Sequence, residues 1–556
     1  PAAAARIQVF EQSGRLPAAA FAASASQRLI GHYWEDAQPM SRCFSGGKPE
    51  LGDFERAANE MCDYLDYSGQ NLVMHPLVWY EGPIYNSLAE ARGGKGGFHM
   101  PTEGWVDILL ERFEERDFTF FGLFNVHELP SLVRATEDSF ERVVAGAGTF
   151  NTVTRQNDLL VKTWHHQAAA FNALHPAVQG RVVALVAEIA ERYGGSPAFG
   201  GIGFHLTLAQ LLLPGFLDVS YDDWTVGEFA RQTGVRVPAM GTDPVRFGRR
   251  HDWLKTNAWE RWLTWRCEQT AAFYVRAADR LREERGDLKL VVTILEPPMS
   301  IIDAQREQWL DGMPQTEIAR LAGVDVELLS RHPGIVIQKR LGPSAYRKRL
   351  AFGTDRARWG AETPPRPDGI AAIRDMDLDA AELRGFKRKP EFGTFLYNRY
   401  FESSVGARRP LECPWYGGIP WRATAVVPAH EHFLEYYARS LAAADPSFIA
   451  TGGFTNGTVG HEARVAQFAR VYRRLPVGDW REIVQPDSKV VMRELVREGV
   501  TWVYAINPAS TPQPVVFATV PGEPVDGSPR IVPQGDARLR LVLRPYQLGA
   551  WRQARP

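Results

Sequence analysis

Carboxylates follow several short apolar runs in this 556-residue chain, at positions that suit acid–base chemistry. The run VVTILE ends in Glu296 and two prolines follow it, so the carboxyl leaves a buried strand, where desolvation raises the pKa toward that of a general acid. Two carboxyl groups about 5–5.5 Å or roughly 6.5–9.5 Å apart cleave a glycosidic bond with retention or inversion, respectively. We predict Glu296 as the general acid and Asp36 or Glu81 as the second catalytic carboxylate.

Aromatic, imidazole, amide and charged side chains gather at the same run ends, and this mixture suits a pocket for a polyhydroxylated ligand. A Trp ring presents a flat apolar face to a sugar ring while its N–H can donate. Arg399 can bind a carboxylate bidentately, which keeps an acidic sugar such as a sialoside or a uronide open as the substrate. The predicted substrate-binding residues are Trp34, His75, Trp79, Tyr80, His127, Glu128, His205, Asn398, Arg399 and Glu402.

Each carboxylate also has an ordinary structural alternative. Glu296 could pair with a neighbouring arginine, and Asp36 and Glu81 could cap a helix or hydrogen-bond a loop. Glu402 could form a salt bridge with Arg399. The number of polar groups at the other run ends favours the catalytic interpretation.

Four histidines, His32, His75, His127 and His205, fall on four successive apolar runs. Imidazoles suit zinc, so a metal-dependent hydrolase is an open alternative. These four histidines form no HExxH motif and no His-x-His pair, which favours sugar ligands or core histidines, and we predict no metal and no cofactor. It also lacks GxGxxG after a strand, GxxxxGK[ST] and GxSxG, the motifs of dinucleotide, nucleoside-triphosphate and serine-hydrolase sites.

Alternating strand-like and helix-like segments must position these residues. Amphipathic segments of helix length separate the strand-like runs, a pattern typical of an α/β protein with a parallel sheet. Eight runs are the number that a closed (β/α)8 TIM barrel needs, and catalytic groups then lie at the C-terminal ends of the strands. The predicted strands are 27–34, 71–80, 118–126, 199–207, 288–296, 334–340, 393–400 and 447–453.

The helical segments and the C-terminal end complete the predicted organisation. We predict helices over 54–69, 105–117, 177–195 and 251–287, and a helix at 224–234 that Asp222 and Asp223 cap rather than serving as catalysts. Two long connections, 127–175 and 341–392, are predicted to wall a substrate cleft. Short alternating strands after 480 predict an antiparallel β-sandwich. The predicted domains are an N-terminal extension (1–26), the barrel (27–480) and the sandwich (481–556).

Composition limits the partners. Lys and Arg number 64 against 65 Asp and Glu, so nothing electrostatic indicates nucleic acid or an acidic membrane surface. No apolar run is long enough to span a bilayer. A carbohydrate is therefore the expected partner, and this substrate class leads us to expect a secreted or periplasmic location.

Three runs carry a family resemblance: GGIGFHL, YDDWTVGEFARQTG and WERWLTWRCEQTAAFYVRAADRLREE. Together with EGPIYNS and AHEHFLEYYARSLAAADPSFIATGG, they resemble the glycosyl-hydrolase-like family ten barrels and, more loosely, the (β/α)8 glycosidase clan. The segment VTWVYAINPAS resembles the C-terminal domain that many glycosidases carry. The resemblance implies a barrel glycosidase, but His205 stands where these relatives have a carboxylate at the end of strand four.

The sequence thus predicts a glycoside hydrolase that acts on a poly- or oligosaccharide. Because His205 replaces the expected acid, Glu296 and a partner carry the reaction, or His205 shares in it as a proton carrier near neutral pH. A non-catalytic carbohydrate-binding barrel is the alternative from another class, beside the metal-dependent hydrolase.

Overall fold

A computed structural model describes most of the chain. The predicted extension 1–26 lies outside the described residues, as do Asp36, Glu296, Asn398, Arg399 and Glu402. The described residues are 28–35, 37, 40, 50–93, 100–135, 139–146, 150–159, 171–206, 211–238, 241–294, 313–341, 380–397, 430–453, 460–485, 487–517, 522–531 and 539–554.

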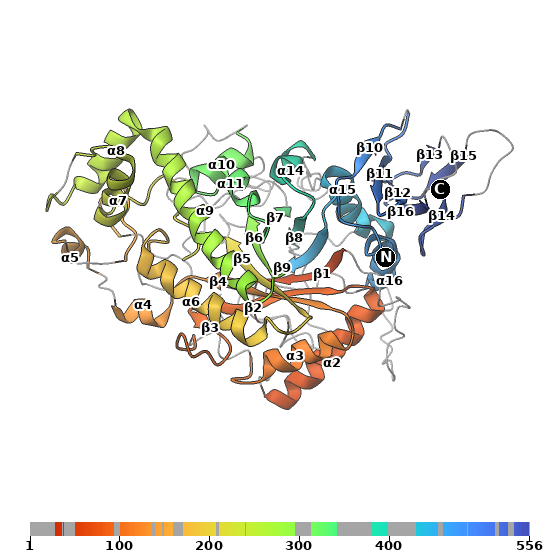
Figure 1. Cartoon of the computed structure of the whole chain (residues 1–556), viewed down its shortest axis with the longest axis horizontal. Coiled ribbons are helices and arrows are strands. Elements are labelled where there is room, and N and C mark those ends of the chain that lie inside the picture. The colour runs from red at the N-terminus through yellow and green to blue at the C-terminus, as the bar shows by residue number, and fades with distance from the viewer. Residues whose placement is uncertain are drawn as a thin grey trace, which may run out of the picture.

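Eight parallel strands form a closed barrel, which confirms the predicted fold (Figure 1). Each strand pairs in parallel with its neighbours, and β1 closes the ring because it pairs with both β2 and β9. A two-residue strand, β3 (Gly82–Pro83), folds back antiparallel on β2. The barrel strands are β1 (Leu29–Trp34), β2 (Leu72–Tyr80), β4 (Thr119–Val126), β5 (Phe199–Leu206), β6 (Lys289–Ile294), β7 (Ile335–Leu341), β8 (Phe392–Tyr397) and β9 (Phe448–Gly453).

Helices surround the barrel and pack on the outward side chains of its strands. The predicted helix over 251–287 is two helices, because the backbone leaves helical geometry at Ala258 (φ −150°, ψ 27°). The helices are α2 (Leu51–Ser68), α3 (Trp105–Glu114), α4 (Pro130–Ala135), α5 (Phe140–Val144), α6 (Pro176–Tyr193), α7 (Asp223–Thr233), α8 (Arg246–Asn257), α9 (Trp259–Glu284), α10 (Gln315–Leu321), α11 (Val326–Ser330), α14 (Ala380–Phe386), α15 (Glu435–Ala444) and α16 (Glu462–Tyr472), with a 3-10 helix η5 (His430–Leu434).

Side chains alternate along each barrel strand between the interior and the helix layer. Tyr33, Met74, Leu123, Val291 and Phe395 belong to the cluster that fills the interior. Their neighbours along the chain pack outward against the helices. Both faces are apolar, as expected for a parallel sheet, so the sequence shows continuous apolar runs rather than a period of two.

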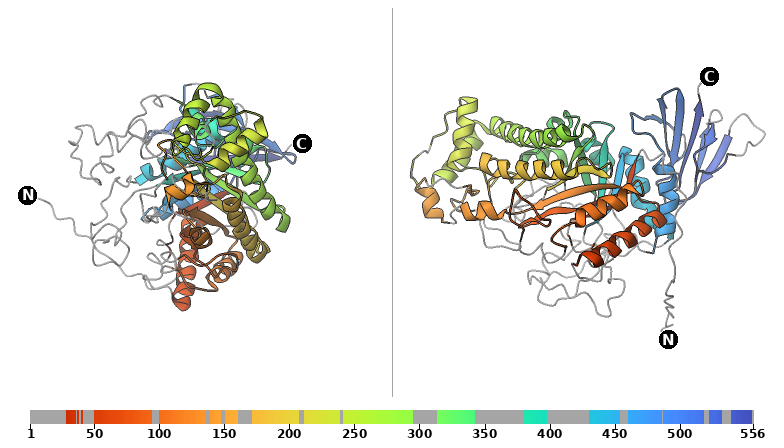
Figure 2. Two further views of the ribbon diagram at one scale, coloured as in Figure 1. Left: turned by 90° about the vertical axis from the view of Figure 1, so that its left-hand side faces the viewer. Right: turned by 60° about the horizontal axis from the view of Figure 1, so that its bottom comes forward.

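A second apolar cluster lies beyond the barrel, among the segments that follow β4 and β5. The N-terminal part of α9 contributes Trp262 and Trp265 to it, whereas the C-terminal part of α9 packs on the barrel through Tyr274 and Leu281. Figures 1 and 2 show this cluster's helices α5, α7 and α8 at one end of the molecule. The single helix α9 thus joins the two cores.

The predicted cap of α7 is confirmed for one of its two acids. Asp222 caps the helix, since its Oδ1 accepts from the Thr225 backbone N–H at 2.9 Å. Asp223 is the first residue of the helix and instead pairs with Arg246 at 2.6 Å and with Arg250 at 2.7 Å. Neither acid is at a strand end.

The chain after 480 forms antiparallel sheets, as predicted. One sheet has the order β10-β11-β12-β16-β14, and β13 pairs with β15 in another. Both sheets contribute to one core, in which Trp551 packs edge-on against Phe517. The strands are β10 (Arg481–Ile483), β11 (Val491–Arg497), β12 (Val500–Ile506), β13 (Gln513–Phe517), β14 (Glu523–Pro524), β15 (Leu539–Leu543) and β16 (Leu548–Ala554).

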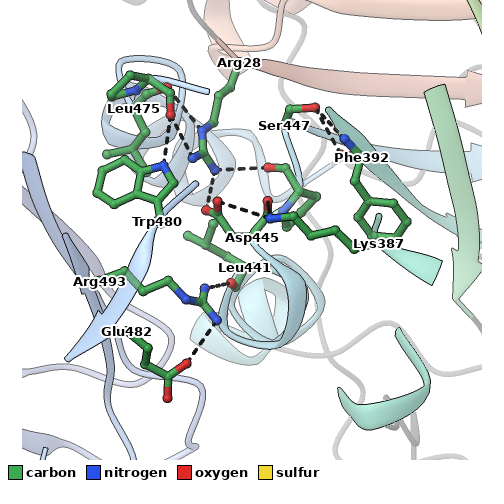
Figure 3. A network of polar contacts seen from close by, with 12 residues as sticks. Arg28, Lys387, Phe392, Leu441, Asp445, Ser447, Leu475, Trp480, Glu482 and Arg493 are labelled. Carbon is green, nitrogen blue, oxygen red and sulfur yellow. Dashed lines mark hydrogen bonds and ion pairs between the residues drawn. The ribbon is translucent and has the colours of Figure 1, made fainter. Parts of the chain in front are cut away.

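A buried polar network joins these sheets to the N-terminal end of the barrel (Figure 3). Arg28, directly before β1, donates to Asp445 Oδ1 at 2.8 Å and to the Leu475 and Pro476 carbonyls. Tyr504 of β12 donates to the same carboxylate at 2.9 Å. The C-terminal sheets are therefore fixed at the end opposite to the C-terminal ends of the strands.

Candidate functional site

The C-terminal ends of the barrel strands bring polar side chains together in the interior. The alternation that points Tyr33 inward also points Glu35 inward, two residues further along. His205 of β5, Thr293 of β6 and Gln338 of β7 occupy the corresponding inward positions on their strands. All are buried, so the site is a polar layer on an apolar barrel core.

His205 is the centre of this layer. Its ring is 1% exposed, with Nδ1 2.5 Å from the Tyr33 hydroxyl oxygen and Nε2 3.3 Å from Glu35 Oε2. One imidazole therefore contacts a phenol and a carboxylate through its two nitrogens. The predicted site residue His205 thus lies at the interior site, beside an acid that the sequence analysis passed over.

Neighbouring strands fix the backbone of Glu35. Its N–H donates to the Gly453 carbonyl of β9 at 3.1 Å, and its carbonyl accepts from the Asn125 side-chain amide of β4 at 2.8 Å. The residue is 8% exposed. A carboxylate held in this way has little freedom to leave the imidazole.

The polar layer continues on the other side of Tyr33. The Thr293 hydroxyl donates to Gln338 Oε1 at 2.7 Å, and the Tyr33 ring stacks on Phe395 at 4.0 Å. Burial raises the pKa of Tyr33 well above its ordinary value, and the nearby charge of Glu35 adds to this, while Thr293 and Arg340 oppose it. The Tyr33 phenol is therefore protonated at physiological pH.

A second group of predicted residues meets at the ends of β2 and β4. The backbone N–H groups of His127 and Glu128 both donate to the Tyr80 carbonyl, at 2.8 and 2.9 Å. The Tyr80 ring meets the His127 ring edge-on at 5.1 Å, and Glu81 follows Tyr80 directly. Tyr80, Glu81, His127 and Glu128 are partly exposed, so the structure brings these four predicted residues together where a ligand can reach them.

Three other predicted ligands lie behind the barrel wall. Trp34 and Trp79 belong to the core between the strands and the helices, and His75 packs edge-on between Trp34 and Trp105 of α3. Each is at most 2% exposed. The structure therefore does not bring these three to the interior site, and their contact with a substrate stays a prediction.

Burial also governs the outward histidines. It lowers the pKa of His32 to about 3 and that of His75 to about 4. His32 stacks on Trp34 at 5.3 Å, on the face of β1 opposite to His205. Within the described ranges, no three or more His, Cys, Asp or Glu side chains form a group that could hold a metal ion.

The remaining predicted residues follow strand ends directly in sequence. Asp36 follows Glu35, and Glu296 comes two residues after the end of β6. Asn398, Arg399 and Glu402 come after β8. Their roles stay predictions.

Sequence reasoning missed Tyr33, Glu35, Thr293 and Gln338. Glu35 can be told from Asp36 by the alternation of β1, in which every second side chain points into the barrel. We call this alternation the parity of the strand. That parity is hidden in the sequence because both faces of the strand are apolar and aromatic.

Comparisons with known proteins do not assign the chain to a family. No protein-family model and no curated protein sequence matches it. Solved structures that it resembles include the α-amylase of Geobacillus thermoleovorans complexed with acarbose (11% identity, TM-score 0.45, 95% of this chain and 98% of that chain). The PgaB (BpsB) glycoside hydrolase domain of Bordetella bronchiseptica is 8% identical, with a TM-score of 0.45, over 81% of this chain and 99% of that chain. The β-amylase catalytic domain of Paenibacillus polymyxa is 8% identical, with a TM-score of 0.41, over 79% of this chain and 95% of that chain.

At these identities and scores the matches carry no argument about this chain, and they do not single out glycosyl-hydrolase-like family ten. The strand order of the chain itself defines it as a TIM-barrel protein with added C-terminal antiparallel sheets. Among the described helices, none combines the length and the apolar composition that crossing a bilayer requires.

Proposed function

We propose that the chain is a glycoside hydrolase that cleaves a bond of a poly- or oligosaccharide at the C-terminal end of its barrel. One observation carries the proposal: the Glu35 carboxylate, at a strand end on the interior side, beside the buried ring of His205. Catalytic groups of TIM barrels lie at these strand ends. Burying a carboxylate costs free energy unless the group is paired, and the contact with His205 supplies such a partner for Glu35.

Glycoside cleavage needs a second carboxyl group. Glu81 follows β2, which is the neighbour of β1 in the barrel, and Glu296 follows β6. We keep Glu296 as the proposed general acid and Glu81 as the alternative. Glu35 takes the place that the sequence analysis gave to its neighbour Asp36.

The partly exposed group Tyr80, His127 and Glu128 is the proposed contact for a sugar beside the reacting bond. An aromatic face together with an imidazole and a carboxylate can bind the apolar and hydroxyl faces of one sugar ring. Asn398 and Arg399 remain proposed ligands, with an acidic sugar as the variant that Arg399 favours. A secreted or periplasmic location belongs to the same proposal.

The test is product release from a broad panel of neutral and acidic glycans, followed by NMR of the first-formed anomer. Release of a defined sugar supports the proposal, and the anomer shows retention or inversion. Binding without release would instead establish a non-catalytic carbohydrate-binding barrel. Neither binding nor release, with protein shown to be folded, would overturn the proposal.

A further inference from the structure

The ring of His205 contacts two groups that can each hold a proton. Its Nδ1 is 2.5 Å from the Tyr33 hydroxyl, and its Nε2 is 3.3 Å from Glu35 Oε2. A neutral imidazole carries one N–H, on one nitrogen or on the other. The positions of the protons on Tyr33, His205 and Glu35 are therefore coupled.

With a neutral imidazole, two arrangements satisfy both contacts. In the first, Tyr33 donates to Nδ1, the imidazole proton is on Nε2, and Glu35 accepts as a carboxylate. In the second, Nδ1–H donates to the Tyr33 oxygen, so Nε2 is an acceptor and Glu35 must be a protonated acid that donates to it.

The first arrangement has the stronger bonds. An N–H donor to a carboxylate is a charge-assisted hydrogen bond, roughly twice as strong as a neutral one. A phenol is also a better donor to an imidazole nitrogen than an imidazole N–H is to a phenol oxygen, because the phenol is the stronger acid. The second arrangement loses both advantages and needs a neutral Glu35.

The charges around Tyr33 favour the same arrangement. Arg340 of β7 and Glu35, which follows β1, are charged groups that act on Tyr33, and His205 of β5 is a titratable group bonded to it. A positive charge that acts on Tyr33 also favours the ionised form of the Glu35 carboxylate beside it. The protonated phenol, in turn, keeps Nδ1 an acceptor.

We infer that His205 is a positioning residue for Glu35: the Tyr33 hydroxyl fixes it as the Nε2–H tautomer, and that N–H holds Glu35 in its ionised form. This inference rests on the proposed function, and it gives Glu35 the role of nucleophile or base. The general acid is then a different carboxyl group, at Glu296 or Glu81. His205 keeps its own proton and does not replace the missing strand-four acid.

The direct test is ¹⁵N NMR of protein labelled at histidine, with the spectrum of a His205→Gln variant subtracted to isolate His205. The Nε2–H tautomer is expected near neutral pH in the unmodified protein. Tyr33→Phe is expected to shift the ¹⁵N signal of Nδ1, which loses its donor, while the Nε2–H signal persists because Glu35 still accepts from it. Tyr472→Phe is the matched control, because it removes another buried tyrosine hydroxyl, which donates to Pro446 at 2.7 Å on the far side of the wall. An Nδ1–H or imidazolium ring in the unmodified protein would overturn the inference.

Turnover provides the second readout. His205→Gln keeps an N–H donor for Glu35 and is expected to retain more activity than His205→Leu. In His205→Leu, the acidic limb of the kcat/KM profile is expected to move up by about one pH unit, because Glu35 loses its donor. In Tyr33→Phe it is expected to move in the same direction, because the Nε2–H donor loses the hydrogen bond at Nδ1 that polarises the ring. An unmoved acidic limb in both variants, with both folded by near-UV circular dichroism, would contradict the positioning role.

The two proposals fail separately. Absence of glycan release with an Nε2–H signal removes the hydrolase and leaves the coupled protons in place. Glycan release together with an Nδ1–H signal supports the hydrolase and overturns the inference about His205.

Discussion

His205 Nε2 lies 3.3 Å from Glu35 Oε2, so a residue of β5 and the residue that follows β1 meet across the barrel interior. Their strands are separated in the sheet by β2 and β4. The contact therefore depends on closure of the barrel and not on local pairing.

The first prediction concerns the carboxylate itself. Glu35→Gln keeps the size of the side chain and its neighbours but removes the charge, so kcat on a released glycan should fall by about 10²–10⁴-fold while glycan affinity is retained. Steady-state kinetics and calorimetric binding measure the two effects. Glu191→Gln, at an exposed position on α6, is the control. Unchanged kcat in Glu35→Gln would exclude Glu35 from the reaction.

The second prediction separates packing from ligand binding at Trp34. The side chain is fully buried beneath α2 and α3, so Trp34→Ala should destabilise the protein by about 3–5 kcal/mol. Urea unfolding measures this. Trp34→Phe should recover much of the loss, with KM unchanged. A raised KM with unaltered stability would support the sequence-based ligand role instead.

The third prediction is loss of stability in acid from His32. Its pKa in the folded protein is about 3, against about 6.5 in the unfolded chain. Between these values the unfolded chain binds the extra proton, so stability falls as the pH drops below 6.5 and levels off below 3. The loss from this residue between pH 7 and pH 5 should be about 2 kcal/mol.

His32→Phe can still stack on Trp34 but cannot take up a proton. The urea concentration at the midpoint of unfolding should therefore differ less between pH 7 and pH 5 in His32→Phe than in the unmodified protein. His430→Phe, at an exposed position, should leave the difference as it is. Equal acid sensitivity of His32→Phe and the unmodified protein would show that His32 is accessible to protons in the folded state.

The fourth prediction concerns the network between barrel and C-terminal sheets. Asp445→Asn leaves the buried Arg28 guanidinium without its counter-charge, which should cost about 3–5 kcal/mol of stability. Glu494→Gln breaks the exposed pair with Arg481 and should cost far less. Thermal unfolding compares the two variants. Asp445 is at the end of the barrel opposite to His205. The fraction of the Asp445→Asn variant that stays folded should therefore keep its activity.

The barrel was predictable because each of its strands is a continuous apolar run between helical segments. The eight predicted runs overlap the eight observed strands, and their ends differ by at most three residues. The break at Ala258 was not predictable, since the residues on both sides keep one helical periodicity. The predicted domain boundary at 480/481 falls directly before β10 and stays a prediction.

The site was predictable only in part. Counting residues at strand ends finds His205, Glu81 and Glu128, because the end of a run is visible in the sequence. It does not distinguish the inward Glu35 from Asp36, or the inward Tyr33 from the outward Trp34, since which face a residue takes depends on the register of the closed sheet. The long-range contact between Glu35 and His205 likewise has no local signal.

The parity of β1 has an evolutionary consequence. The strand alternates between two sets of side chains, with Tyr33 and Glu35 on one face and His32 and Trp34 on the other. Insertion or deletion of one residue in this strand would exchange the two sets, placing the indole in the interior and the carboxylate under the helices. Substitution can therefore vary the site, whereas a one-residue change in the length of β1 would dismantle it.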